Sequence, residues 1–513
     1  VGSDRAWNAI LHDGLRKENP GVFRAVNPRF TSGFGRAMEQ AVDAAGAMGS
    51  ATGSAGDGSD MELIIRPDAK LFDGRYANNG WLMELPDPMT KITWDNVALM
   101  SMKTAEKLGI PTERHLSDIS APIVKLTVEG RTIEIPAWIQ PGHAEDSITV
   151  TVGYGREGLG RVADGAGTNT YPLRSTTAQY ATAVQVEVTD RDTEMACTQA
   201  QFSLEGRDMV RSTTLSDYKE HPNFATYKSV HGYEVPGIKE MEENGESDGP
   251  ISLFDETYGP DYEPQWGMAI DLNACFGCGV CTIACQAENN IPVIGKKEVS
   301  RRRIMHWIRT DRYFAGDIDN PQVYHQPVPC MHCELAPCEQ VCPVAATTHS
   351  DDGMNQMTYN RCIGTRYCAN NCPFKVRRFN FFNYTDEYLT QGDDPEIVQM
   401  AMNPEVTVRF RGVMEKCSYC VQRVNREKIT TKRETGSPKP ADGTVLTACQ
   451  QACPADAITF GDLTDNNSVV VQHKRTDRNY QMLEELNVRP RTSYLAMLKN
   501  PHPSLYEAPA KKH

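Results

Sequence analysis

Cysteine spacing limits the fold of this chain more than any other feature. Fifteen of the sixteen cysteines lie between residues 275 and 453, in four groups. The groups are Cys275-x2-Cys278-x2-Cys281-x3-Cys285; Cys330-x2-Cys333-x4-Cys338-x3-Cys342; Cys362-x5-Cys368-x3-Cys372; and Cys417-x2-Cys420 with Cys449-x3-Cys453 further on. Three groups end in Cys-Pro, at Pro343, Pro373 and Pro454, whereas Gln286 follows the first group. So many thiols in so few residues indicate a metal-binding region.

The run C-x2-C-x2-C-x3-C-P is typical of bacterial ferredoxins, where three thiolates bind one iron–sulfur cluster and the fourth binds another. Two-residue gaps in a tight loop let several thiolates face one cluster. The cysteine three residues further on is expected at the start of a helix, directed toward a neighbouring cluster. A proline after it fits the first turn of such a helix. The four groups therefore predict iron–sulfur clusters.

Two other uses of cysteine fit the spacing less well. Structural zinc takes two separated pairs of ligands, commonly with histidine, whereas three cysteines here fall within seven residues. We interpret His332, inside the second group, as a loop residue. Disulfide frameworks belong to small secreted domains, and a chain of 513 residues does not need one. The remaining thiol, Cys197, is interpreted as a buried structural cysteine.

The number of cysteines predicts the types of cluster. Four [4Fe–4S] clusters need sixteen cysteine ligands, and the four groups supply fifteen. The gap lies in the third group, where Thr365 stands at the position that would restore the ferredoxin spacing. A hydroxyl is a poor ligand for iron beside thiolates, so we predict three [4Fe–4S] clusters and one [3Fe–4S] cluster. A fourth iron held by Thr365 or by water is the open alternative.

Charge and hydropathy exclude some partners. The net charge of −14 and the pI near 5.4 argue against nucleic acid. No apolar run approaches the roughly 18 residues of a membrane span, so membrane contact is expected through another subunit. The chain begins Val-Gly-Ser without an initiator methionine or signal peptide, and we expect it to be a portion of a longer protein.

Residues before the cysteine region follow strand and helix patterns. We predict a helix over 35–45, a flexible loop over 46–59, and a helix over 101–108 between Ser101 and Gly109. Strands are predicted at 63–65, 148–152 and 184–188, with a hairpin around Glu129-Gly130. These strands predict a β-rich domain, most simply a barrel.

The fold class is therefore α+β, a β-barrel domain followed by a double ferredoxin-like domain. We predict these segments: 1–59, the end of a preceding domain plus a flexible loop; 60–205, the β-rich domain; 206–266, an extended linker; 267–475, the four-cluster domain; and 476–513, a C-terminal tail.

Three stretches of the cluster domain have patterns of their own. Residues 301–309, with three successive arginines, are predicted to be strand-like, with a solvated face as the default. Residues 374–384 interleave aromatic and cationic side chains, which fits either a docking face for a membrane subunit or packing around a cluster. Residues 386–408 are interpreted as an insertion.

The β-rich domain carries local sequences of a known type. Residues 79–96, 108–110 and 170–174 resemble the C-terminal dinucleotide-binding barrel of the molybdopterin oxidoreductases. This resemblance implies a domain that closes over a cofactor whose metal ligand lies elsewhere. His143 is interpreted as a turn residue and not as a catalytic one.

The cysteine region resembles the electron-transfer subunits of the dimethyl sulfoxide reductase family, through residues 329–338 and 361–368. The resemblance implies that the first group pairs with the fourth and the second with the third. The implied ligand sets are a first set, Cys275, Cys278, Cys281 and Cys453; a second set, Cys285, Cys417, Cys420 and Cys449; a third set, Cys330, Cys333, Cys338 and Cys372; and a fourth set, Cys342, Cys362 and Cys368, with Thr365 at the missing position.

A barrel running directly into four cysteine groups is similar to the B subunit family of alternative complex III. This resemblance implies an electron-transfer subunit on the periplasmic face of the bacterial inner membrane, without molybdopterin. A membrane subunit would oxidise quinol, the [3Fe–4S] cluster would receive the electrons, and haem c subunits would take them onward. No catalytic residues are expected in this chain. The alternative is the electron-transfer part of a molybdenum or tungsten oxidoreductase acting on sulfur compounds, nitrate or formate.

Overall fold

The computed structural model describes residues 60–112, 119–175, 179–226, 264–384 and 395–502. The helix predicted over 35–45 and the loop predicted over 46–59 lie outside these ranges. All described residues belong to one compact unit. Their mixed strands and helices agree with the α+β prediction.

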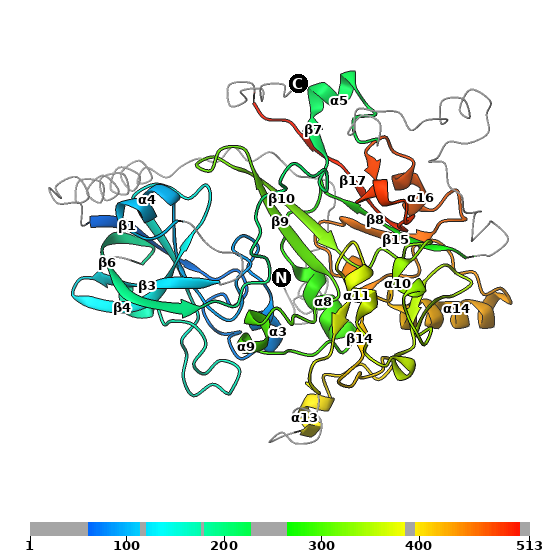
Figure 1. The fold of residues 1–513 in the computed structure, drawn as a ribbon, viewed down its shortest axis with the longest axis horizontal. Helices are drawn as coiled ribbons and strands as arrows, with labels where there is room; N and C mark the ends of the chain where they lie inside the picture. Colours follow the sequence, from blue (N-terminus) through cyan, green and yellow to red (C-terminus); the bar gives the residue numbers. More distant parts are fainter. Residues whose placement is uncertain (1–59, 113–118, 176–178, 227–263, 385–394, 503–513) are drawn as a thin grey trace, which may run out of the picture. The chain divides into compact units, whose positions relative to one another are not determined.

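The first described strands close into a barrel in the order β1-β5-β2-β4-β3-β6, drawn in blue to green-cyan in Figure 1. Their bounds are β1 Asp60–Pro67, β2 Ala98–Met100, β3 Ser120–Val128, β4 Arg131–Ile139, β5 Ser147–Val152 and β6 Ala181–Glu194. Alternate residues point inward, so that Leu63, Leu126 and Val150 are fully buried in one apolar core. The predicted barrel shape is present.

The predicted hairpin and helix of this domain are confirmed. Val128 pairs with Arg131 across Glu129 and Gly130, whose φ angles of 48° and 76° suit a tight hairpin turn. Helix α4 (Met102–Lys107) begins after Ser101, whose hydroxyl accepts a 3.1 Å hydrogen bond from the Thr104 amide. It ends before Gly109, at φ +70°.

A four-stranded sheet of order β15-β8-β17-β16 lies in the cysteine region. Strand β8 (Trp266–Asp271) pairs with β15 (Ile458–Asp462) on one side and β17 (Thr492–Leu495) on the other, and β16 (Asn479–Tyr480) pairs with β17. The sheet thus extends past residue 475, where we predicted the C-terminal tail to begin. Within the predicted linker, β7 (Ser212–Thr214) pairs with β18 (Met497–Lys499) and leads into α5 (Leu215–Glu220).

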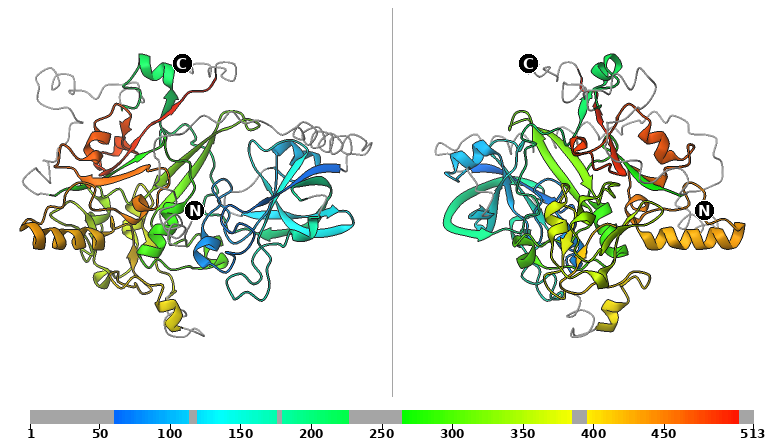
Figure 2. Two further views of the ribbon diagram at one scale, coloured as in Figure 1. Left: turned by 180° about the vertical axis from the view of Figure 1, so that it is seen from behind. Right: turned by 45° about the vertical axis from the view of Figure 1, so that its right-hand side comes forward.

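The remaining elements of the chain are mostly short helices, turns and strand pairs, and cysteines lie in α8, α10, α11 and α15. A two-stranded ribbon of β9 (Arg309–Ala315) and β10 (Gln322–Val328) is visible in green in both views of Figure 2. The other elements are helices α3 Gly80–Glu84, α8 Val280–Glu288, α9 Lys296–Ser300, α10 Pro337–Gln340, α11 Tyr367–Asn371, α13 Pro395–Gln399, α14 Val421–Thr435, α15 Ala448–Gln451 and α16 Val469–Lys474; 3-10 turns η1 Tyr171–Leu173, η2 Tyr359–Arg361 and η3 Glu484–Leu486; and strand pairs β11 Thr347–His349 with β12 Asn355–Met357 and β13 Arg378–Phe379 with β14 Met414–Glu415.

The strand-like segment predicted over 301–309 is wrong. Residues 301–308 form a turn and irregular chain, and β9 begins only at Arg309. The five residues 304–308 are all buried, so their bulky side chains do not alternate between core and solvent as a half-exposed strand requires. Arg301 and Arg302 are exposed, as the solvated-face interpretation expects.

Polar contacts join the barrel region to the cysteine region. Glu84, at the end of α3 and 1% exposed, accepts hydrogen bonds from the amides of Ile294 (3.0 Å) and Gly295 (2.8 Å). The ammonium of Lys296 lies 2.7 Å from a carboxylate oxygen of Asp95. Burial raises the pKa of Glu84 to about 7, although the two amides act in the opposite direction.

Among the helices that the structure describes, none combines the length and the apolar character needed to cross a lipid bilayer.

Candidate iron–sulfur sites

All four cysteine loops share one backbone feature. The residue two positions after the first cysteine of each loop has a left-handed conformation: Gly277 (φ 77°), His332 (46°), Gly364 (75°) and Tyr419 (54°). The next residue is Cys278, Cys333, Thr365 or Cys420. A reversal at this point turns the chain so that two successive ligand positions face the same side. Only the glycines had a sequence signal for this conformation.

The Cys275 loop and the Cys362 loop match more closely still. In both, a second left-handed residue follows, Gly279 (φ 77°) and Arg366 (φ 62°), and it is the N-cap of the next helix, α8 or α11. By this register Thr365 occupies the backbone position of Cys278. Thr365 is exposed and Cys368 is buried.

The thiols of the second set line one cavity. Cys285, Cys417, Cys420 and Cys449 enclose it together with apolar side chains that include Met268 and Ile308. Burial raises the pKa of the Cys285 thiol well above its ordinary value, and the neighbouring thiolates of the other three cysteines add to the rise. The four cysteines come from two distant parts of the chain, α8 and residues 417–449.

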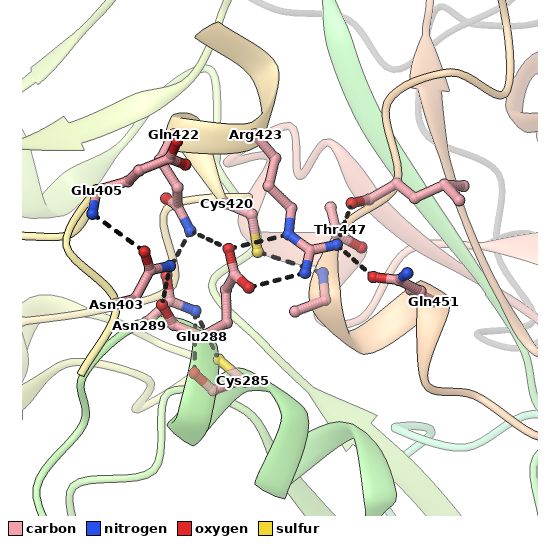
Figure 3. A network of polar contacts seen from close by, with 12 residues as sticks. Cys285, Glu288, Asn289, Asn403, Glu405, Cys420, Gln422, Arg423, Thr447 and Gln451 are labelled. Atoms are coloured by element: carbon pink, nitrogen blue, oxygen red, sulfur yellow. Dashed lines mark hydrogen bonds and ion pairs between the residues drawn. The ribbon is translucent and has the colours of Figure 1, made fainter. Parts of the chain in front are cut away.

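Hydrogen bonds fix two of these sulfurs in place (Figure 3). The amide of Asn289 donates to Cys285 Sγ (3.5 Å), and the Ala448 backbone donates to Cys420 Sγ (3.4 Å). Beside them Arg423 of α14 donates to both carboxylate oxygens of Glu288 of α8, at 2.9 and 2.7 Å. This two-point ion pair holds α8 against the start of α14.

The third set also lines a cavity of its own. Its cysteines, Cys330, Cys333, Cys338 and Cys372, surround a space whose remaining wall includes Phe374, Val376 and Arg377. Burial raises the pKa of the Cys333 thiol well above its ordinary value, and the other three thiolates add to the rise. All four cysteines are buried.

The first and fourth sets lie nearer the surface. Cys275, Cys278 and Cys453 are partly exposed, as are Cys342 and Cys362. Burial raises the pKa of Cys275 to about 11; the Gly277 amide opposes the rise, and the Cys453 and Cys278 thiolates add to it. In the fourth set, burial raises the pKa of Cys368, Arg377 opposes the rise, and the thiolates of Cys362 and Cys342 add to it. The structure thus places the second and third sets around one cavity each, Cys275 near Cys278 and Cys453, and Cys368 near Cys342 and Cys362.

Neighbouring thiols of different sets reveal their order in space. Among the neighbouring thiolates, Cys449 of the second set does most to raise the pKa of Cys281 in the first set. Likewise, Cys330 of the third set is the thiolate that does most to raise the pKa of Cys417 in the second set. Arg377 lies close to Cys338 of the third set and to Cys368 of the fourth. The sets therefore follow one another from first to fourth, an order that spacing alone did not predict.

The donors fit iron–sulfur clusters better than a single ion. In the ranges that the structure describes, no three Cys, His, Asp or Glu side chains converge closely enough to hold one metal ion. The thiols instead surround cavities, as ligands at the corners of a larger group do. A bound metal would have to displace the protons that burial holds on these thiols, so binding should release protons. Thiolates and sulfide are soft ligands that suit iron in such clusters.

The predicted role of the Cys-Pro prolines is wrong. Pro343, Pro373 and Pro454 begin turns after short helices, and none begins a helix. In each turn the residue three positions after the cysteine is left-handed, with φ between 47° and 53°. The turn directs the Ala346 amide to Cys342 Sγ (3.2 Å) and the Ala457 amide to Cys453 Sγ (3.3 Å). Proline's fixed φ suits such a turn as well as it suits a helix start.

Single residues outside the sets lie where predicted. Cys197 is buried (4% exposed) and donates to the carbonyls of Thr90 and Gln199. His143 follows a turn, and its Nε2 lies 2.9 Å from Thr149 Oγ1. His332 is a buried loop residue whose ring stacks on Tyr419, with centroids 3.7 Å apart.

One part of the aromatic segment 374–384 fits packing around a cluster, and another part fits a docking face. Phe374 and Val376 are buried, which fits packing around the third set. Phe382 is 49% exposed, which fits a docking face. Between them Phe379 and Phe381 meet edge to face, with centroids 4.8 Å apart. Residues 386–394 of the predicted insertion lie outside the described ranges.

Arginines line a pocket beside Thr365, with a volume of about 420 Å³. We name it the arginine pocket; its cations are Arg302, Arg303, Arg366, Arg377 and Arg378. Arg303 lies over the Phe381 ring at 4.5 Å and pairs with Glu298 at 2.7 Å. A concentration of positive charge here contrasts with the net charge of −14.

Comparison with known proteins supports iron–sulfur clusters in the cysteine region. Two family models, each described as a 4Fe-4S dicluster domain, match residues 274–346 and 321–387. The first match spans the first two cysteine groups, and the second spans the second and third.

Curated relatives include the iron-sulfur cluster-binding subunit of menaquinone reductase from Nitratidesulfovibrio vulgaris, 36% identical over 240 residues, which are 46% of this chain and 90% of that protein. A protein of Halobacterium salinarum described as a dimethyl sulfoxide reductase iron-sulfur subunit is 33% identical over 45% of this chain and 79% of its own length. Iron-sulfur subunit 1 of the Hdr-like menaquinol oxidoreductase of Archaeoglobus fulgidus is 31% identical over 45% of this chain and 82% of its own.

Four cysteine loops on ferredoxin-like turns define an iron–sulfur electron-transfer protein. Since the match spans most of the relatives' length, the chain belongs to the family of iron–sulfur electron-transfer subunits of oxidoreductase complexes.

Proposed function

We propose that this chain is the electron-transfer subunit of a quinol-oxidising respiratory membrane complex of the alternative complex III type. It would carry single electrons from a quinol site in a membrane subunit toward haem c subunits, on the periplasmic face. The observation that carries the proposal is the order of the four sets, which ends at the one set with threonine in place of cysteine. The fusion of a barrel to these sets adds support.

The four sets would hold three [4Fe–4S] clusters and one [3Fe–4S] cluster. Such clusters, when bound, accept and release one electron at a time. The residues of the chain keep water from the second and third sets and supply hydrogen bonds to their sulfurs, which tunes the potential. The partly exposed first and fourth sets are suited to exchange with partners.

The arginine pocket supports a membrane subunit as the partner at the fourth set. It lies beside Thr365 and borders the aromatic segment 374–384, which includes the exposed Phe382. Exposed cations with aromatic faces suit a partner with acidic side chains. Charge reversal at the exposed Arg366 (Arg366→Glu) should therefore weaken association with the membrane subunit several-fold at low salt, and less at high salt. Co-purification at several salt concentrations measures this effect; Arg161→Glu, in the barrel region, is the matched control.

A second candidate is the electron-transfer part of a molybdenum or tungsten reductase. One named relative favours it, because that protein is called a dimethyl sulfoxide reductase subunit. The barrel would then contact a cofactor held by other domains.

Metal analysis of the anaerobically purified complex distinguishes the two. The proposal expects about fifteen irons per chain, no stoichiometric molybdenum or tungsten, and quinol-dependent reduction of haem. Stoichiometric molybdenum or tungsten would support the second candidate instead. Zinc in place of iron would contradict both.

A further inference from the structure

Arg377 is a buried cation between the third and fourth sets. Its side chain is 6% exposed and lines both the cavity of the third set and the arginine pocket beside Thr365. Nη2 donates to Thr347 Oγ1 at 2.7 Å. Nε and Nη1 have no hydrogen-bond partner within the described residues. These donors lie next to the thiols of two sets, and a side-chain hydrogen bond from the guanidinium opposes the rise in the pKa of Cys368.

Lys416 occupies a similar place between the second and third sets. It is 1% exposed, and its ammonium donates to the carbonyls of Cys417 (2.8 Å) and Asn355. Cys417 belongs to the second set, and Asn355 lines the cavity of the third. Burial raises the pKa of Cys338 to about 12, and the charges of Arg377 and Lys416 both oppose this rise.

Neither cation forms an ion pair with a carboxylate in the part of the chain that the structure describes. A buried charge without a counter-charge is costly. The thiolates of the adjacent sets interact with both: Cys338 and Cys368 with Arg377, and Cys338 and Cys417 with Lys416. Each cation is thus placed where a thiolate-bound group would balance it.

We propose that Arg377 and Lys416 are shared tuning cations, each raising the reduction potential of the two clusters beside it. The proposal rests on the ligand sets of the proposed function. Reduction adds one electron and breaks no bond, so the site gains one unit of negative charge. A cation at short range in a low-dielectric interior stabilises that extra charge. Arg377 would act on the third and fourth clusters, and Lys416 on the second and third.

The test is a redox titration of the purified complex with dithionite as reductant, followed by electron paramagnetic resonance. We expect Arg377→Gln to lower the equilibrium constant for reduction at least about tenfold at the third and fourth sets, a shift of about 59 mV for one electron. Lys416→Gln should produce the same shift at the second and third sets and leave the fourth unchanged. The third set is thus the one affected by both variants.

Two controls separate charge from fold. Arg211, equally buried at 5%, pairs with Glu484 at 3.2 Å, so Arg211→Gln removes a buried cation without altering the cysteine sets. Arg377→Lys keeps the charge and should keep both potentials near those of the unsubstituted protein. If Arg377→Gln lowers the iron content, this lysine variant still decides: a loss of potential as large as expected for glutamine would overturn the role of charge.

Iron content separates the failure of this proposal from that of the proposed function. An unsubstituted protein without iron would contradict the cluster sites themselves. Full iron with unchanged potentials in Arg377→Gln and Lys416→Gln, or a shift at only one neighbour of each cation, would overturn the shared tuning role alone.

Discussion

The Cys275 loop and the Cys362 loop are two copies of one backbone with one different ligand position. Both have left-handed residues at corresponding places, and both lead into a helix whose second residue is a cysteine, Cys281 or Cys368. They differ at Cys278 and Thr365. The third loop therefore keeps the backbone shape for a fourth ligand and lacks only the sulfur.

The same two loops lie at the two ends of the order of sets. Each exposes an apolar side chain beside its first cysteine, Phe276 at 59% and Ile363 at 65%. The cysteines of the second and third sets are all buried. An exposed apolar residue beside a cysteine at each end suits contact with partner proteins, whereas the inner sets need protection from water.

Exchange of the differing residues gives the largest expected effect. Thr365→Cys should supply the missing thiolate, raise the iron content by about one per chain and convert a [3Fe–4S] cluster into [4Fe–4S]. An oxidised [3Fe–4S] cluster is paramagnetic and an ordinary oxidised [4Fe–4S] cluster is not. The paramagnetic resonance signal of the oxidised protein should therefore disappear.

The reciprocal variant, Cys278→Thr, should create such a signal from the first set. Thr365→Ser is the control, because a serine hydroxyl replaces a threonine hydroxyl and the signal should persist. About sixteen irons and no signal in the unsubstituted oxidised protein would contradict this prediction, because the fourth set would then hold a complete [4Fe–4S] cluster despite Thr365.

Alanine at the shared glycines should produce the next largest effect and distinguish the loops. Each variant forces a Cβ into left-handed backbone, at a cost of about 1–2 kcal/mol. At Gly277 the added atom meets the ring of His325, beginning at Cγ, and this side chain can rotate away. At Gly364 it meets the carbonyl oxygen of Gly412, which is backbone. Gly364→Ala should therefore cost more stability and lose more iron than Gly277→Ala.

Iron analysis and thermal unfolding measure both variants. Gly158→Ala is the control, because Gly158 has φ +71° and no atom within 4 Å of the added Cβ. It should lower stability by the conformational cost alone and retain all iron. Equal iron loss in the two loop variants would contradict the difference in their surroundings.

The sequence predicted what depends on local pattern. The hairpin at Glu129-Gly130, the cap at Ser101 and the loop position of His332 are each decided by a few adjacent residues. The prolines were interpreted wrongly, because the φ of proline suits a turn as well as a helix start. Residues 301–309 were interpreted wrongly, because bulky residues can all be buried in irregular chain and need not alternate as in a strand. Arg377 and Lys416 had no sequence signal, since their places between sets depend on how distant segments pack. The spatial order of the sets is unpredictable for the same reason.

The effect expected to be smallest at the cysteine sets themselves concerns support of the Cys275 loop by the barrel region. Leu85, next to Glu84, lies 3.1 Å from where a Cβ on Gly279 would stand. Burial raises the pKa of Glu84 from 4.5 to about 7. The folded protein therefore holds this proton more tightly than the unfolded chain, and the stabilisation is complete below pH 4.5 and lost as the pH rises through 7.

Glu84→Gln should remove this pH dependence, since the amide oxygen can still accept from Ile294 and Gly295. Across pH 4.5–7 the unsubstituted protein should lose up to about 3 kcal/mol relative to the variant, because each pKa unit corresponds to about 1.4 kcal/mol. Calorimetric unfolding temperatures across this range measure the difference, with the exposed Glu145→Gln as control. The resonance signal of the Cys362 loop should stay constant in Glu84→Gln; a change there would mean that the barrel region supports both loops and that their surroundings differ less than the structure indicates.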